Sequence, residues 1–535
     1  MFSIRAHPPR QEHHARPSFA PSVDAAFETM TVFGKPSHPE RGRELTSSGD
    51  GGAAVRPDWR LLLWTGLAVA LLGLGVECVR YLMLGAYLDH IESTVVINGW
   101  QYVHGAALYE IEDGAPRFSS FYGPLAYLAP VPALLLFGAS VWASKVAAAL
   151  GLTATLAVMA RHLARGTPAN AAAPMLLLAA ALLLFGKVSF WARSDSLLLL
   201  VTAVAVALAE RRRGALWVGL AIGVAVNLKA HAFLYFLPLL FDLWRRGGWR
   251  AVPVVAVSSL TVFLLPFLLP GLSLPDYVAG LVQQMGHRSH VWSIAVGPIL
   301  VAGLLALPLI VAWRGAPDRA PRQDRAFAAA AAATLAVLLY PASFTGAGAY
   351  HLLPFLPVLT EAFRRLQPES GAARLAPLAI LLFALPQTAV TMHDMRERQG
   401  DAPLAEEALA LAQQSGGATV HMGYGDNQRS YLVSQLGKAV LALHGFPALI
   451  DAQVLGELDY VGVDGSRRWI PYLRDCRIAR WLVPKGERPF ALAGYYDDHP
   501  LFDEDFRRAF TDNYRLVHSS KNFDIWQCQT PNSKF

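Results

Sequence analysis

Residues 171–190, AAAPMLLLAAALLLFGKVSF, contain one charged side chain, that of Lys187. A helix needs roughly 20 mostly apolar residues to cross about 30 Å of bilayer hydrocarbon, and this stretch supplies them. Comparable apolar runs follow one another from Leu61 to Met392. Because lipid offers no hydrogen bonds to the backbone, a crossing segment must satisfy its own N–H and C=O groups, so these runs predict membrane-spanning helices.

The composition agrees with a membrane protein. The chain has 535 residues, of which 54% are hydrophobic and 16% charged, whereas soluble domains usually carry about 25% charged residues. Basic clusters lie between the apolar runs, at residues 161–165, 210–213, 245–250, 314–325 and 364–374. Because cytoplasmic loops are enriched in Lys and Arg, the net charge of +6 is a topology signal and not a nucleic-acid footprint.

The same clusters predict the number of crossings. If all of them face the cytoplasm, an even number of crossings separates each from the next, which gives about eleven crossings, an inner N-terminus and an outer C-terminus. The apolar run 122–138 contains three prolines and would reverse this order, so we expect a re-entrant or juxtamembrane element there. The spans on either side of Lys229 are short, which predicts helices that break or that extend into protein-lined space.

Three regions differ in composition. Residues 1–55 are polar and lack the apolar core of a signal peptide, so we expect a disordered leader, with Met30 as an alternative start. Residues 56–392 form the predicted membrane domain. In residues 393–535 turn dipeptides appear and apolar runs shorten, which predicts a small extracytoplasmic α/β domain. Its expected elements are a helix at 403–414 and strands at 418–422, 479–483 and 523–528. Cys476 and Cys528 in this region either pair or remain two buried thiols.

Ionisable residues gather near the predicted outer ends of the spans. Charges at membrane depth are costly and tend to face cavities or partners, which makes them functional candidates, although each one alone could equally be a solvated loop charge. The group consists of Asp89, Glu92, Arg193, Asp195, Lys229, His231, His287, Arg288, His290 and His351. Inside the first span, Glu77 and Arg80 stand at i,i+3 spacing and are expected to neutralise each other.

Short motifs occur in a fixed order along this region. They are Asp89-His-Ile-Glu92, Gly105-Ala-Ala-Leu-Tyr109, Tyr122-Gly-Pro-Leu125, Arg193-Ser-Asp195, Gly219 to Lys229 leading into Pro238, and Tyr350-His-Leu-Leu-Pro354. Their order and sidedness resemble the GT-C superfamily of polyprenyl-phosphate-sugar glycosyltransferases, including the mannosyl- and arabinosyltransferase-like members. Each motif is degenerate, so the resemblance rests on the series, which covers about residues 60–360.

The resemblance implies a site and a reaction. In that superfamily a first-loop acid is the general base, so Asp89 or Glu92 would take the proton of an acceptor hydroxyl. Cationic side chains would stabilise the leaving lipid phosphate, with Tyr122, Asp195 and His351 beside them. Asp195 either orients Arg193 or forms with it a neutralising pair that caps a helix, and His351 either supports the site or is a packed, hydrogen-bonded histidine. The cationic candidates are Arg193, Lys229, His287, Arg288 and His290. A base without a covalent nucleophile predicts one displacement with inversion.

Other functions compete with this one. A transporter or lipid flippase would share the hydropathy but should show two related halves with broken helices in corresponding positions, and no such halves are evident. A scaffold protein would leave the outer-end charges without a common target. No metal-binding spacing occurs, so no cofactor is expected, with a metal left open. The expected partners are a polyprenyl-phosphate-linked sugar, a glycan or glycolipid acceptor and the lipid of a bacterial inner membrane, and not nucleic acid.

Overall fold

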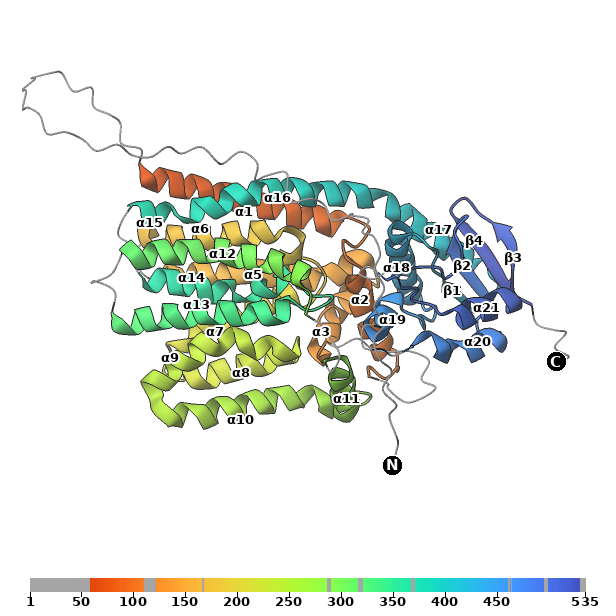
Figure 1. Cartoon of the computed structure of the whole chain (residues 1–535), viewed down its shortest axis with the longest axis horizontal. Coiled ribbons are helices and arrows are strands. Elements are labelled where there is room, and N and C mark those ends of the chain that lie inside the picture. The colour runs from red at the N-terminus through yellow and green to blue at the C-terminus, as the bar shows by residue number, and fades with distance from the viewer. Residues whose placement is uncertain are drawn as a thin grey trace, which may run out of the picture. The chain divides into compact units, whose positions relative to one another are not determined.

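The computed structural model describes residues 58–109, 122–165, 168–285, 290–315, 321–366, 371–459, 462, 464–494 and 499–529. Most of this part is helical, and the helices before residue 400 run side by side (Figure 1). They are α1 (Trp59–Met83), α2 (His90–Val103), α3 (Pro124–Leu128), α4 (Val131–Phe137), α5 (Val141–Leu163), α6 (Pro168–Phe185), α7 (Asp195–Ala209), α8 (Gly214–Val226), α9 (Leu237–Gly247), α10 (Ala251–Leu264), α11 (Leu274–Met285), α12 (Trp292–Gly315), α13 (Arg322–Ala342), α14 (Leu356–Arg365), α15 (Gly371–Leu375) and α16 (Pro377–Glu397).

The bundle is that of a multi-pass membrane protein. In the described part of the chain, seven helical segments are long and apolar enough to cross a bilayer, while 124–137, α7 and α8 are apolar but shorter. Large apolar side chains such as Leu72, Leu268 and Leu382 are exposed on the outside of the bundle. A soluble protein rarely exposes so much apolar surface, whereas lipid accommodates it.

The run 122–138 forms two short helices, α3 and α4, which together are shorter than a membrane-spanning helix. The re-entrant or juxtamembrane placement of this element stays a prediction. Gly123 begins this element and touches the end of α8, because a Cβ atom at Gly123 would lie 2.2 Å from the carbonyl oxygen of Asn227. The Leu125 amide donates to the same carbonyl oxygen at 3.1 Å. Only glycine permits this approach, so the Tyr-Gly-Pro-Leu motif joins α3 to α8.

The expected break near Lys229 is present. Helix α8 ends at Val226, and a 3-10 segment, Ala230–Phe236, leads into α9. Asn227 lies at the break, and its amide donates to the carbonyl oxygens of Gly223, Val262 and Phe263 at 3.0–3.2 Å. A side-chain amide therefore satisfies backbone groups where the helices are irregular, as burial in an apolar medium requires.

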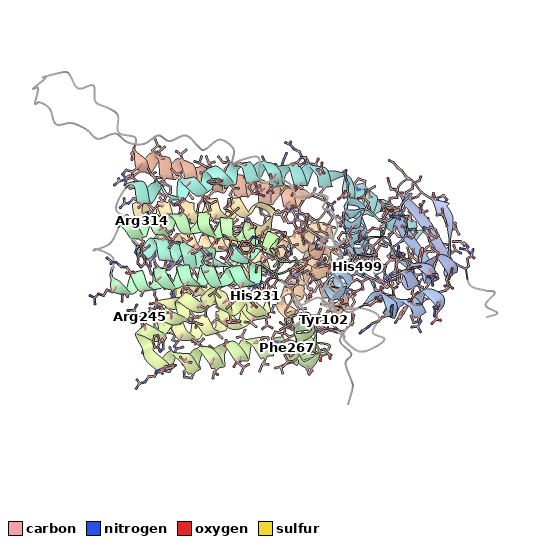
Figure 2. All side chains as sticks on the ribbon, in the orientation of Figure 1. Tyr102, His231, Arg245, Phe267, Arg314 and His499 are labelled. Atoms are coloured by element: carbon pink, nitrogen blue, oxygen red, sulfur yellow. A yellow bond between two sulfur atoms is a disulfide. The ribbon has the colours of Figure 1, made fainter. Side chains whose placement is uncertain are left out.

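The two ends of the bundle differ in charge. Figure 2 shows Arg245 and Arg314 at one end of the helices and His231 and Tyr102 toward the other. At the basic end, Arg365 of α14 pairs with Glu361, Asp242 and Glu210 at 2.7–3.1 Å. This network joins α7, α9 and α14. The separation of the basic clusters from the motif residues is the arrangement on which the predicted topology depends.

The C-terminal region, residues 393–529, carries a mixed four-stranded sheet in the order β1-β2-β4-β3. Strand β1 pairs in parallel with β2, and β4 lies antiparallel to both β2 and β3. The expected helix at 403–414 and the three expected strands are confirmed, while β3, α18, α19 and α21 were not predicted. The elements are α17 (Asp401–Gln413), β1 (Val420–Met422), α18 (Gln428–Leu443), α19 (Ala452–Asp459), α20 (Ile470–Arg474), β2 (Arg480–Pro484), α21 (Glu504–Asn513), β3 (Tyr514–Ser519) and β4 (Phe523–Cys528).

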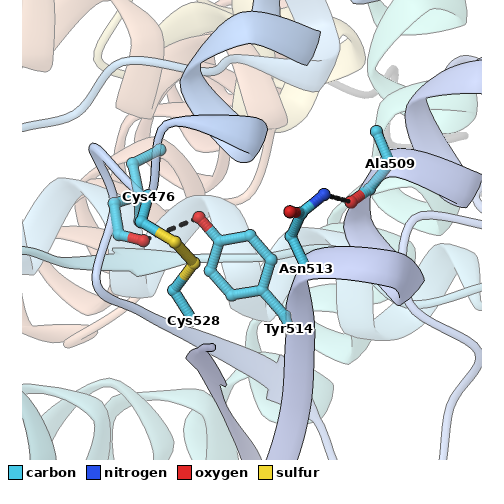
Figure 3. Close-up of a disulfide and its surroundings, with 6 residues drawn as sticks. Cys476, Ala509, Asn513, Tyr514 and Cys528 are labelled. Atoms are coloured by element: carbon cyan, nitrogen blue, oxygen red, sulfur yellow. Dashed lines mark hydrogen bonds between the residues drawn. A yellow bond between two sulfur atoms is a disulfide. The ribbon is translucent and has the colours of Figure 1, made fainter. Parts of the chain in front are cut away.

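Cys476 and Cys528 form a disulfide between the segment after α20 and the end of β4 (Figure 3). Next to it, the Tyr514 hydroxyl donates to the carbonyl oxygen of Ile478 at 2.7 Å. Of the two alternatives left by the sequence, the paired state is therefore the one present. Cys78 in α1 is a buried free thiol.

Candidate active site

Asp89 lies between α1 and α2, and its carboxylate caps α2. It accepts from the Ile91 amide at 2.9 Å, and Oδ1 also faces Nη1 of Arg193 at 3.2 Å. Burial alone would raise the pKa of Asp89, but the neighbouring His90 and Arg193 and the Ile91 amide lower it below its usual value. The side chain keeps 17% of its exposure, so Asp89 is a reachable carboxylate held in its ionised form.

Arg193 is the centre of the cluster. Its guanidinium lies 4.1 Å from the ring centroid of Trp191 and 4.9 Å from that of Tyr350. Nη2 donates to the Tyr122 hydroxyl at 2.9 Å. Aromatic faces attract a guanidinium, so the planar cation is oriented by two rings and held at its edge by Asp89 and Tyr122.

A second acid–base pair adjoins the first. Asp195 begins α7, and its Oδ1 accepts from the Lys229 ammonium, while Oδ2 accepts from Trp191 Nε1 at 3.0 Å and faces Arg193 Nε at 3.5 Å. Lys229 precedes the 3-10 segment that follows α8, so the helix break places its ammonium at the cluster. The ammonium also lies 5.0 Å from the Tyr350 ring centroid.

Glu92 is also close to Asp89 but has a different environment. Its Oε2 accepts from the amides of Leu88 and Asp89 at 2.7 and 2.8 Å, and its Oε1 accepts from the Ala192 amide at 2.7 Å and from the Tyr81 hydroxyl. Glu92 is fully buried, and this burial raises the pKa of its carboxyl group. Four donors occupy its two oxygens, which connects the Asp89 loop to the segment that carries Arg193.

Lys145 of α5 was not among the residues singled out from the sequence. Its ammonium is fully buried and donates to the carbonyl oxygens of Tyr81, Leu84 and Ala86 at 2.6–2.9 Å. These carbonyls belong to the last turn of α1 and the residues after it, so Lys145 ends α1 and directs the chain toward Asp89. A lysine inside an apolar run was the available signal.

The histidines occupy several places. His231 and His351 face each other, with 3.0 Å between Nε2 and Nδ1, and His351 lies beside Tyr350. His290 instead contacts Ser343 at 2.7 Å and stacks on Phe344. His287 and Arg288 fall outside the described residues. No group of three or more His, Cys, Asp or Glu side chains suited to a metal ion occurs in the described ranges.

The C-terminal region reaches the cluster through α18 and α19. Thr94 of α2 donates to Asp451 at 2.8 Å, and Lys438 of α18 pairs with Asp451 at 2.7 Å. The Tyr431 ring lies 5.7 Å from that of His90, so this region borders the same end of the bundle. Figure 1 shows α2 and α3 at the end of the bundle that faces the sheet.

Solved structures were compared with this fold. ArnT from Cupriavidus metallidurans in the apo state superposes with a TM-score of 0.54 at 13% identity, over 87% of this chain and 97% of that one. ArnT bound to undecaprenyl phosphate gives a TM-score of 0.52 at 14% identity with the same coverage. The chain has the fold of ArnT.

The likeness to ArnT is a likeness of fold, at 13–14% sequence identity. It covers both the helical bundle and most of the C-terminal region. No family model matches the sequence, and no curated protein matches it. The likeness to ArnT was therefore found from the three-dimensional fold and not from sequence comparison.

Proposed function

We propose that the protein is a membrane glycosyltransferase that moves a sugar from a polyprenyl-phosphate donor to an extracytoplasmic glycan or glycolipid acceptor. The observation that carries this proposal is the cluster of Asp89, Arg193, Asp195 and Lys229 at one end of an ArnT-like bundle. ArnT has been solved with undecaprenyl phosphate bound, and a lipid phosphate needs cations next to an apolar surface. Arg193 and Lys229 are such cations, at one end of an apolar helical bundle.

In the proposed reaction, each of these side chains acts at a defined step. Asp89 accepts the proton of the acceptor hydroxyl as that oxygen bonds to the anomeric carbon of the sugar. The bond from the anomeric carbon to the phosphate oxygen breaks, and the polyprenyl phosphate leaves with the electron pair. Arg193 and Lys229 stabilise the charge that develops on it. A single displacement inverts the anomeric centre.

Asp89 is the better candidate for the base, and Glu92 the poorer one. A general base must come within about 2.6–3.2 Å of the proton that it abstracts. Asp89 is partly exposed, whereas the oxygens of Glu92 are covered by four donors. Tyr122 and Asp195 orient the cations, and His351 lies behind Tyr350. His287 and Arg288 remain candidates for additional phosphate contacts, while the contacts of His290 with Ser343 and Phe344 make it a weaker one.

The proposal includes an orientation and a role for the C-terminal region. With the basic end in the cytoplasm, about eleven crossings put the motif residues and residues 393–535 outside. A disulfide in this region suits an oxidising compartment such as the space outside a bacterial inner membrane. Because α18 and α19 border the cluster, acceptor binding is the role that we assign to them.

Two experiments test the proposal. Mass spectrometry of surface glycans and glycolipids, with and without the gene, should reveal a missing sugar that identifies the donor and the acceptor together. Purified protein should then transfer that sugar from its synthetic polyprenyl-phosphate donor. A flippase would bind the same lipid and leave the sugar attached to it, so lipid binding without any transfer would favour the transporter alternative.

A further inference from the structure

Arg193 already has partners at both of its terminal nitrogens, while its Nε lies near a carboxylate without making a hydrogen bond. Nη1 faces Asp89 at 3.2 Å, Nη2 donates to Tyr122 at 2.9 Å and Nε faces Asp195 at 3.5 Å. Only 5% of the residue is exposed. A guanidinium binds a carboxylate or a phosphate through the same fork of N–H groups. A phosphate at this fork therefore competes with Asp89 for the positive charge of Arg193.

The charges of the cluster lead to the same conclusion. Two carboxylates, Asp89 and Asp195, face two cations, Arg193 and Lys229, so the four side chains sum to zero. A lipid phosphate adds negative charge to a neutral cluster, so it must compete with the two carboxylates for the two cations. Asp195 is bound by Lys229 and Trp191 as well as facing Arg193. In the part of the chain that the structure describes, the cation paired with Asp89 is Arg193, and the ring of His90 lies farther away, at 3.9 Å.

We infer that the donor phosphate displaces Asp89 from Arg193, so that the base is released only when the donor is bound. This inference rests on the proposed function and concerns the order of events within that site. Asp89 does not have to leave its position, because the amides of the first turn of α2 continue to hold it. Asp89 thus loses Arg193 as its ionic partner, while its hydrogen bonds to the first turn of α2 keep it at the same distance from the incoming acceptor.

The consequence is a base whose strength depends on the donor. While Arg193 is paired with it, the carboxylate of Asp89 is stabilised as an anion and attracts a proton weakly. Once the phosphate neutralises Arg193, the same carboxylate becomes more basic. The other charged or titratable groups around it are His90, Glu92, Lys187, Lys229, Tyr122 and Tyr431, and none of them exchanges partners in this step.

The test uses undecaprenyl phosphate alone, without sugar or acceptor, bound to the full-length protein in nanodiscs. Asp89→Asn removes the competitor and keeps a good helix cap, so the variant should bind at least about threefold more tightly than the unaltered protein. Asp426→Asn removes an equal charge from the ion pair with Arg488 on the surface of the C-terminal region. This matched control should leave the affinity unchanged.

A thermodynamic cycle separates competition for Arg193 from simple charge repulsion. In an Arg193→Met background, Asp89→Asn should give little or no gain in affinity, because there is no longer a shared partner. If that background binds too weakly to measure, Arg193→Lys replaces it, since lysine keeps the charge but lacks the fork.

An equal gain in both backgrounds, or unchanged or weaker binding by Asp89→Asn, overturns the inference. Absence of any binding by the unaltered protein overturns the proposed function instead. The two failures are therefore distinguishable.

Discussion

Asp89 caps the start of α2 and Glu92 lies in its first turn, and the two carboxylates differ in their surroundings. Asp89 is partly exposed and faces a cation, whereas Glu92 is enclosed by backbone amides and a tyrosine hydroxyl. Asp89→Asn keeps the size and the helix cap but cannot accept a proton. We expect turnover to fall by about 10²- to 10⁴-fold, with insertion into the membrane intact. Turnover of a synthetic polyprenyl-phosphate sugar by purified protein measures this, and full activity of the variant would exclude Asp89 as the base.

Glu92→Gln tests the enclosed carboxylate. The oxygens of Glu92 accept from two pairs of donors, but an amide has one oxygen and can serve only one pair. The NH₂ group of the glutamine must then face the N–H groups of Leu88 and Asp89, or that of Ala192. An unsatisfied buried donor costs about 1–3 kcal/mol. We expect a lower unfolding temperature and a smaller loss of turnover than in Asp89→Asn. Because Glu92 acts through the position of Asp89, its effect on turnover should largely disappear in the Asp89→Asn background. Normal turnover of Asp89→Asn with an inactive Glu92→Gln would move the base to Glu92.

The sequence could locate these residues but not rank them. The order of the motifs brought Asp89, Arg193, Asp195 and Lys229 into one group, because each follows or precedes an apolar run on the same predicted side. To decide whether Asp89 or Glu92 is the better base, the hydrogen-bonding partners of each carboxylate are needed, and these lie about 100 positions away in the sequence. Spacing alone also misled, since Glu77 lies against Thr388 while Arg80 contacts Met392.

At the scale of elements, Gly123 joins α3 to α8. Gly123→Ala would put a methyl group 2.2 Å from the carbonyl oxygen of Asn227, a distance that forces the two elements apart. Overpacking of this kind costs about 1–3 kcal/mol or more. It should also separate Tyr122 from Lys229, so undecaprenyl phosphate should bind at least about tenfold more weakly. Gly75→Ala in α1, where the added methyl group meets nothing within 4 Å, is the control and should behave like the unaltered protein.

Strand β1 carries a histidine whose burial makes the C-terminal region sensitive to acid. Burial, with a smaller effect of Lys438, lowers the pKa of His421 to about 3. An unfolded chain binds this proton near pH 6.5, so the stabilisation is complete above that pH and is lost as the pH falls toward 3.

We expect the region to lose about 2 kcal/mol between pH 6.5 and pH 5. His421→Phe should remove this slope while matching the unaltered protein at pH 7.5. The midpoints of urea unfolding, followed by pulse proteolysis of the full-length protein, provide the measurement. Identical slopes for both proteins would show that His421 does not control the pH dependence.

The predicted strands have an apolar or alternating pattern, whereas β3 is exposed along almost its whole length as the edge of the sheet. Its sequence, YRLVHS, lacks the alternation that marks a half-buried strand. For the run 122–138 the three prolines led us to expect a re-entrant or juxtamembrane element, and the two short helices α3 and α4 themselves were not predicted.

At the scale of the whole molecule, the orientation decides whether the candidate site can work outside the cell. Reporter fusions after Arg213, Arg250 and Arg325 should report the cytoplasm, and a fusion after Met392 should report the outside. Cys476 and Cys528 provide an independent readout, because they close a loop across a sequence separation of 52 residues. In an oxidising compartment both thiols should resist maleimide labelling until a reductant is added.

Cys528→Ser should then cost the C-terminal region about 2–5 kcal/mol. A cytoplasmic signal from the fusion after Met392, together with free thiols in intact cells, would put Asp89 and Arg193 on the inner face. That outcome contradicts both the topology and the extracytoplasmic acceptor. An outer fusion signal with free thiols would leave the topology standing and show only that the disulfide does not form in the cell.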